Sequence, residues 1–166
     1  MMPIALAAAM IASTPDLGKR EGQCRADEAG PALLIEAVGL KDRMGLLRAE
    51  LYPAVDADFL ADDNILVAAG KTFARVEMPL PATGPVRLCI RVPRAGRYAL
   101  SLLHDRNANR KLDLSVDGIG FPGNPRLGWS RPKAASAAVE ASAGLTRIEI
   151  RLNYRRGLAM RPLDDR

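Results

Sequence analysis

The stretch Val86-Arg87-Leu88-Cys89-Ile90-Arg91-Val92 alternates apolar side chains with Arg87, Cys89 and Arg91. A second stretch, Arg147-Ile148-Glu149-Ile150-Arg151-Leu152-Asn153, repeats this alternation closer to the C-terminal end. Successive side chains of a β-strand point to opposite faces, so each stretch predicts a strand with one face buried and one face in water.

Weaker alternation of the same kind occurs elsewhere, and Gly- and Pro-containing segments separate the alternating stretches. The expected strands are 33–38, 47–52, 72–78, 86–92, 98–103, 135–141 and 147–153. One short helix is expected within Asp56 to Ala69, where apolar residues lie among carboxylates. The pattern predicts an all-β fold, a single antiparallel sandwich of two sheets and about seven strands, of the immunoglobulin type.

The length of 166 residues suits one domain, and the composition, 48% hydrophobic and 26% charged, is that of a chain that folds. We divide it into a signal peptide at 1–15, a polar linker with Cys24 at 16–29, the sandwich at 30–156 and a tail at 157–166.

The composition of the amino-terminal segment is typical of an export signal. Met1 to Thr14 carries no charge and Ile4 to Ala12 is apolar, yet the run is too short for a membrane span. No Lys or Arg precedes the run, and the cleavage site stays open. A buried helix is the alternative, which Pro15 and the polar residues after it disfavour. We expect a periplasmic or secreted protein without a membrane span.

Export changes the interpretation of the two cysteines, Cys24 and Cys89. Disulfides persist outside the cytoplasm, so these residues predict one bridge rather than two free thiols. The bridge would close a loop of 65 positions, for which chain entropy gives roughly 4 kcal/mol of stabilisation.

The charge is uneven along the chain. Residues 1–70 have 6 basic and 11 acidic side chains, whereas residues 71–166 have 18 and 8. Most arginines occupy alternate strand positions, which favours solvated strand faces over a nucleic-acid footprint. Nucleic acid is therefore not an expected partner, and an acidic envelope polymer or another envelope protein is the candidate partner.

The loop after the strand at 98–103 has the oxygen spacing of an EF-hand-like calcium loop. The candidate calcium ligands are Asp105, Asn107, Asn109, the carbonyl of Lys111, Asp113 and the further carboxylate of Asp117. Arg110 stands where such loops have glycine, so either it takes a positive φ or the loop bends differently, and Val116 replaces the closing Glu. The alternative is a metal-free loop shaped by Asx-turns.

The chain resembles the exported bacterial family called domain of unknown function 2141. The resemblance rests on Gly96-Arg97-Tyr98-Ala99-Leu100, the segment His104 to Asp113, Gly128-Trp129-Ser130 and Ile148 to Tyr154, and it covers 33–154. It implies an exported β-sandwich similar to transthyretin and to the non-catalytic carboxypeptidase regulatory domains. It implies no activity.

These features favour a non-catalytic binding or structural accessory domain, with the loop at 104–130 as its working end. Trp129 is a candidate for stacking on a sugar or for covering one end of the sandwich. The alternative function is a small periplasmic metal-dependent hydrolase that uses His104, Asp105 and Asp113. Apart from the candidate Ca²⁺, no cofactor is expected.

Overall fold

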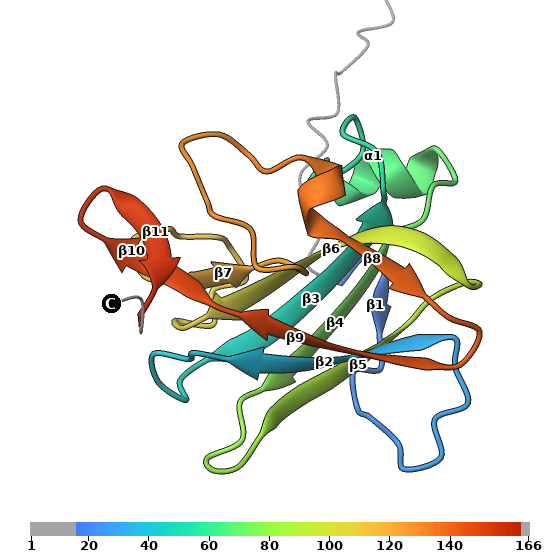
Figure 1. The fold of residues 1–166 in the computed structure, drawn as a ribbon, viewed down its shortest axis with the longest axis horizontal. Coiled ribbons are helices and arrows are strands. Elements are labelled where there is room, and N and C mark those ends of the chain that lie inside the picture. Colours follow the sequence, from blue (N-terminus) through green and yellow to red (C-terminus); the bar gives the residue numbers. More distant parts are fainter. Residues whose placement is uncertain (1–15, 164–166) are drawn as a thin grey trace, which may run out of the picture.

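The computed structural model describes residues 16–163, which form eleven strands, one α-helix and one short 3-10 helix (Figure 1). In chain order the elements are β1 Lys19–Arg20, β2 Ala32–Val38, β3 Leu46–Pro53, α1 Asp63–Ala68, β4 Ala74–Pro79, β5 Val86–Arg91, β6 Gly96–Asp105, β7 Gly118–Gly120, η1 Ala134–Ala137, β8 Ala138–Ala141, β9 Leu145–Arg151, β10 Asn153–Arg156 and β11 Ala159–Pro162. The prediction of an all-β fold is confirmed.

The strands form two sheets. The larger sheet has the order β1-β4-β3-β6-β7-β10-β11, with β8 also paired to β6, and the smaller has the order β5-β2-β9. The finer prediction of about seven antiparallel strands needs correction, because β2 pairs parallel with β9 and β1 pairs parallel with β4. Alternation identifies strands but not their neighbours, and additional strands of two to four residues are too short to show it.

The main core lies between the two sheets. It includes Leu33 and Ile35 of β2, Leu47 and Leu51 of β3, and Ile90 of β5. A second, smaller core covers the outer face of the large sheet at one end, where α1 and η1 pack. The large sheet therefore has two apolar faces over part of its area.

The last alternating stretch is divided between the sheets. Residues up to Arg151 belong to β9 in the small sheet, whereas Asn153 begins β10 in the large sheet. β10 pairs antiparallel with β11 as a hairpin, so the large sheet continues through Pro162. The expected strand at 135–141 begins as the 3-10 helix η1 and becomes extended only at Ala138.

The residues before β2 connect the edges of the two sheets. Lys19 and Arg20 pair with β4 at the edge of the large sheet, and the N–H of Cys89 in β5 donates to the carbonyl of Gly22. The predicted disulfide between Cys24 and Cys89 is confirmed. Arg91 adds hydrogen bonds to two carbonyls of this segment. The segment closes the side of the sandwich where β4 and β5 would otherwise be open edges.

The predicted signal peptide at 1–15 lies outside the described residues. Within residues 16–163, no helix has the length and apolar character needed to cross a bilayer.

Candidate functional site

The connection from β6 to η1 is the longest irregular part of the described chain and is interrupted only by the short strand β7. It begins at a buried polar cluster at the end of β6 and ends at an exposed loop beside the β10–β11 hairpin (Figure 1). The two parts differ in the hydrogen bonding of their polar groups and in the exposure of their apolar side chains.

His104, the penultimate residue of β6, is fully buried. Its Nε2 lies 2.8 Å from the carbonyl oxygen of Met44, which can only accept, so Nε2–H donates to it. Nδ1 is thereby left to accept from the hydroxyl of Tyr154, at 2.6 Å. Burial lowers the pKa of His104 below its usual value, because the charged form loses its hydration.

Tyr154 completes this arrangement from β10. Its hydroxyl oxygen also accepts from the backbone N–H of Lys41, and burial raises its pKa to about 12. His104 therefore joins the β2–β3 connection to β10 as a neutral hydrogen-bonded residue. Both ring nitrogens are occupied in this role.

Asp105 organises the turn that follows. Its Oδ1 accepts from the N–H of Asn109 at 3.2 Å and its Oδ2 accepts from the N–H of Arg110 at 2.7 Å. Arg110 adopts a φ of +62°, the left-handed conformation that position 6 of the calcium-loop pattern requires. The carboxylate of Asp105 itself is fully buried.

Asn107 and Asn109 shape the same turn through Asx hydrogen bonds. The side-chain oxygen of Asn107 accepts from the N–H of Asn109, and that of Asn109 accepts from the N–H of Lys111. The metal-free interpretation predicts hydrogen bonds of this type. The side chain of Lys111 is exposed.

Asp117, also buried, holds the other end of the turn. Its Oδ1 accepts from the N–H of Arg106 and its Oδ2 from the N–H of Asp113. Asp113 in turn accepts from Ser115, and this hydrogen bond lowers the pKa of Asp113. We refer to residues 105–117, bound together in this way, as the Asp turn.

The structure thus places the candidate calcium ligands in one turn. Within residues 16–163, no three His, Cys, Asp or Glu side chains gather in a way that could hold a metal ion. The candidate set relies instead on asparagine and carbonyl oxygens, and calcium binding stays a prediction. Titration calorimetry with calcium tests it, with Asp105→Ala as the variant that should remove any heat of binding.

A buried charge network lies on the outer face of β3 and β4. Arg75 donates to Glu50 at 2.8 Å and to Asp63 at 3.0 Å, and Arg48 faces Glu77 at 3.4 Å. The carboxylates raise the pKa of Arg75 against the opposing effect of its burial. These charges are paired with one another, as buried charges must be. Strand alternation predicts that these residues face away from the main core, but not that α1 covers Arg75.

Trp129 lies at the far end of the connection. Its side chain is 88% exposed, so it does not cover the end of the sandwich. It borders three adjoining hollows with volumes of about 450, 270 and 460 Å³, and all three also touch Leu127 and Met160. We call these hollows together the Trp129 groove.

Apolar side chains line much of the groove, with polar groups among them. Ile119, Phe121 and Leu127 belong to the second core or pack against it, and they line the part nearest the sheet. Leu112, Leu114 and Leu158 are about half exposed or more and border the outer part. Strand β11 contributes Met160.

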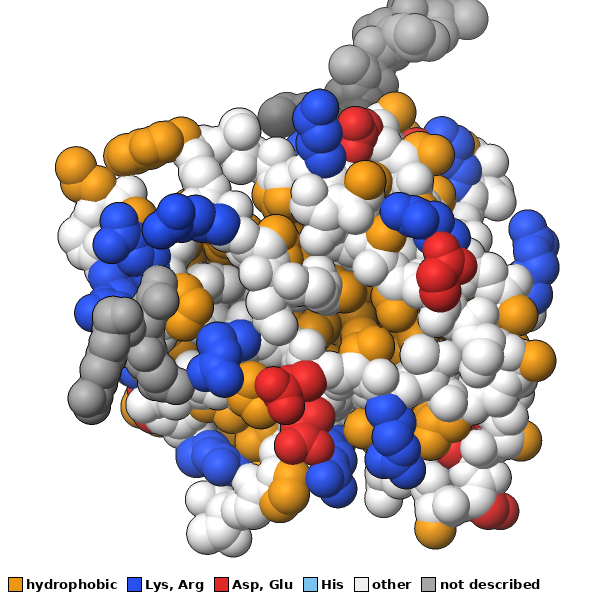
Figure 2. Space-filling view, viewed as in Figure 1, with side chains coloured by type: hydrophobic (Ala, Val, Ile, Leu, Met, Phe, Trp, Pro, Cys, Tyr) orange, Lys and Arg blue, Asp and Glu red, His pale blue; other side chains and the backbone are white. Residues whose placement is uncertain are grey.

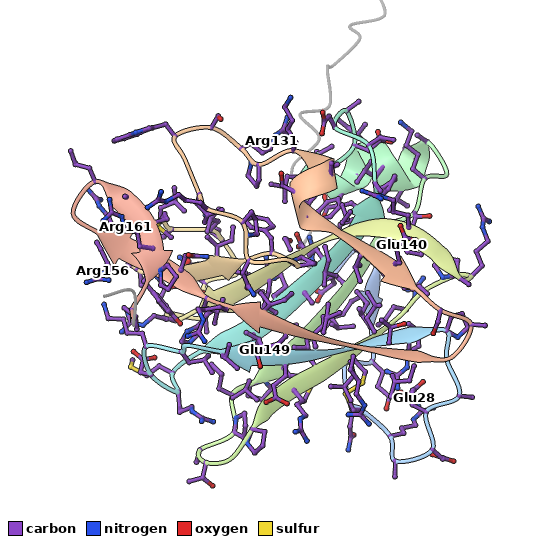
Figure 3. The ribbon with its side chains drawn as sticks, in the orientation of Figure 1. Glu28, Arg131, Glu140, Glu149, Arg156 and Arg161 are labelled. Atoms are coloured by element: carbon purple, nitrogen blue, oxygen red, sulfur yellow. A yellow bond between two sulfur atoms is a disulfide. The ribbon has the colours of Figure 1, made fainter. Side chains whose placement is uncertain are left out.

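The charged residues that line the groove all have one sign. They are Arg126, Arg131, Arg151, Arg155 and Arg161. In the described part of the chain, no Asp or Glu lines any of the three hollows. Figure 2 shows basic side chains gathered over the β10–β11 hairpin, with hydrophobic side chains projecting at the same edge. In Figure 3, Arg156 and Arg161 extend from the hairpin and Arg131 lies on the loop nearer η1, whereas Glu28 and Glu140 lie away from the hairpin.

Sequence reasoning identified Trp129 as a candidate but missed the other groove residues. Leu112 and Leu114 sit inside the calcium-loop pattern, and Leu158 and Met160 sit in the segment expected as a tail. The cluster Arg155, Arg156 and Arg161 around exposed Leu158 is the signal that could have identified the hairpin as part of a site.

Residues 35–149 match the family described as "Uncharacterized protein conserved in bacteria (DUF2141)". The chain belongs to this family. The resemblance seen in the sequence is therefore confirmed, and no curated protein and no solved structure matches the chain. The DUF2141 match contains the Asp turn and Trp129 but ends before β10 and β11, which form one side of the Trp129 groove.

Proposed function

We propose that this DUF2141 chain is an exported, non-catalytic binding or accessory domain that contacts its partner through the Trp129 groove. The observation that carries the proposal is the combination, on one face, of exposed apolar side chains and arginines with no acidic residue among the described groove residues. Contiguous exposed apolar surface bordered by polar groups is typical of interaction sites.

Export is supported by the Cys24–Cys89 disulfide, because such bridges persist in oxidising compartments. The uncharged, apolar composition of residues 1–14 supports it further. The disulfide joins the amino-terminal segment to β5, on the sandwich rather than at the groove, which suits a structural role for the bridge.

A non-catalytic role is supported by the state of the residues that a hydrolase would use. His104 and Asp105 are both fully buried, and their polar atoms bind backbone groups or Tyr154. A general base must reach the proton that it removes, and neither side chain has access to a substrate in this conformation. The metal-dependent hydrolase is accordingly the weaker alternative.

The partner expected for this groove combines negative charge with apolar surface. Arginine is well suited to carboxylate and phosphate groups because its planar guanidinium offers paired donors. An acidic envelope polymer or an acidic, apolar face of another envelope protein has part of this chemistry.

A soluble probe with the same chemistry tests the proposal. Anilinonaphthalene sulfonate is apolar and anionic, and it should bind the native protein and fluoresce there. The chain has one Trp, so quenching of its emission by the probe reports contact at Trp129. We expect at least tenfold weaker probe binding in Trp129→Ala, and unchanged binding in Ile65→Ala, an exposed position on α1.

Two outcomes would overturn the proposal. The first is a native protein that does not bind the probe, or binds it equally well without Trp129. The second is hydrolysis of ester, phosphoester or glycoside substrates that disappears in His104→Ala, which would assign an enzymatic function instead.

A further inference from the structure

The two most exposed large apolar side chains of the described residues lie next to each other on one face. Trp129 is 88% exposed and Leu158 is 77% exposed, and they border the same hollow. Leu112 and Leu114, 51% and 49% exposed, lie beside them. Half of the large hydrophobic side chains exposed in the described chain therefore gather at the Trp129 groove.

Trp129 and Leu158 are carried by protruding loops. Leu158 is in the two-residue turn between β10 and β11, and Trp129 is in the loop between Phe121 and η1. Figure 1 shows this hairpin and this loop extending side by side from one end of the sandwich, and the residues of both line the groove. Side chains this exposed at the tips of two protruding segments offer apolar surface to an extended partner.

Arginines flank both apolar tips. In the sequence Arg126 and Arg131 precede and follow Trp129, and Arg155 and Arg161 precede and follow Leu158, and all four line the groove. All four are exposed, and Arg126, Arg131 and Arg161 have no carboxylate within 4.0 Å among the described residues. The carboxylate of Asp113, which lies between Leu112 and Leu114 in the sequence, is bound by Ser115 within the Asp turn.

We propose that this face docks on the surface of an anionic phospholipid bilayer, with Trp129 and Leu158 at the depth of the headgroups and the four arginines on lipid phosphates. The inference rests on the proposed function of the groove. Trp is suited to this depth because its ring is apolar and its N–H is polar, and basic residues bind anionic headgroups. An acidic polymer would satisfy the arginines but would leave Trp129 and Leu158 in water.

Vesicle sedimentation of the full chain tests the proposal. We expect the protein to sediment with vesicles of equal parts phosphatidylglycerol and phosphatidylcholine, and not with pure phosphatidylcholine. Binding should weaken as salt is raised. The single Trp should shift its emission to shorter wavelength with the anionic vesicles, because its ring leaves water.

Two variants separate the apolar and charged contributions. Trp129→Ala should lower vesicle partitioning at least tenfold. The pair Arg131→Gln with Arg161→Gln should lower it about 25-fold, from roughly fivefold for each arginine. The control pair is Arg94→Gln with Arg147→Gln, which removes the same charge from exposed positions away from the groove, and it should change partitioning less than about threefold.

The outcomes distinguish this inference from the proposed function. Binding of anilinonaphthalene sulfonate without binding to anionic vesicles overturns lipid docking and leaves the groove as a binding site for another partner. Retention on heparin without vesicle binding overturns it in favour of an acidic polymer. Vesicle binding that is unchanged in Trp129→Ala also overturns it, since adhesion would then depend on charge alone. Failure of both the probe and the vesicles overturns the proposed function as well.

Discussion

The Asp turn and the Trp129 groove belong to the same connection between β6 and η1, yet they are opposite in character. In the Asp turn, Asp105 and Asp117 each bind two backbone N–H groups, and both carboxylates are buried. In the groove, Trp129 and Leu158 are in water and the flanking arginines face no carboxylate among the described groove residues. In the Asp turn the polar side chains are hydrogen-bonded within the protein. In the groove the apolar side chains and the arginines are exposed to water, so this part of the connection is the one suited to a partner.

The largest expected effect concerns the Asp turn. Asp105→Ala should lower the free energy of unfolding by about 3 kcal/mol, because two N–H groups lose their charged acceptor. Chemical denaturation of the two proteins measures the difference. Asp113→Ala is the matched control, since Asp113 is only partly buried and its loss should lower the free energy of unfolding much less. Equal small losses in both variants would contradict the view that Asp105 organises the turn.

A subtler change should act at the other end of the turn. Asp117→Asn keeps the size of the side chain but brings an N–H₂ group against the N–H of Arg106 or of Asp113. We expect the free energy of unfolding to fall by about 2 kcal/mol, with vesicle and probe binding at the groove retained. Loss of groove binding in a folded Asp117→Asn protein would break the separation between the two regions.

His104 predicts how stability depends on pH. Its pKa is lowered in the folded protein, so the unfolded chain takes up a proton first as the pH falls. The free energy of unfolding should therefore decrease from about pH 7.5 to about pH 5, by at most about 1.4 kcal/mol per pH unit. Stability is present above the unfolded pKa near 6.5 and is lost below it.

Because the chain has one histidine, no other histidine contributes to the pH dependence of stability in this range. Denaturation at several pH values should show the slope in the parent protein and a flat profile in His104→Gln over the same range. A slope that persists in His104→Gln would show that another group is responsible.

The smallest expected effect concerns the stability contribution of the groove. Trp129→Ala and Leu158→Ala should each change the free energy of unfolding by less than about 0.5 kcal/mol, because side chains this exposed bury little apolar surface on folding. Thermal unfolding followed by far-ultraviolet circular dichroism measures this. A loss above about 1.5 kcal/mol for Trp129→Ala would mean that the residue supports the fold, and would remove the contrast between the two regions.

The contrast also explains what could be predicted for each region. The spacing of Asp105, Asn107 and Asn109 is local, so the sequence indicated a tight turn. It left open whether Arg110 takes a positive φ or the loop bends differently, and the structure has a positive φ there. The groove draws on residues from Tyr52 to Met160, which are far apart in the chain. Only the pairing of β10 with β7 and with β11 brings Leu158 and Met160 to Trp129.

By itself the sequence determined the strand-rich fold, six strands to within two residues at each end, and the Cys24–Cys89 pair, because alternation and cysteine number are local or compositional properties. The tertiary structure alone decided the parallel pairing of β2 with β9, the crossing between sheets at Leu152 and the burial of His104. Each of these depends on which distant segments share a sheet or a core. That choice is made by packing over the whole domain, and no short stretch of sequence contains it.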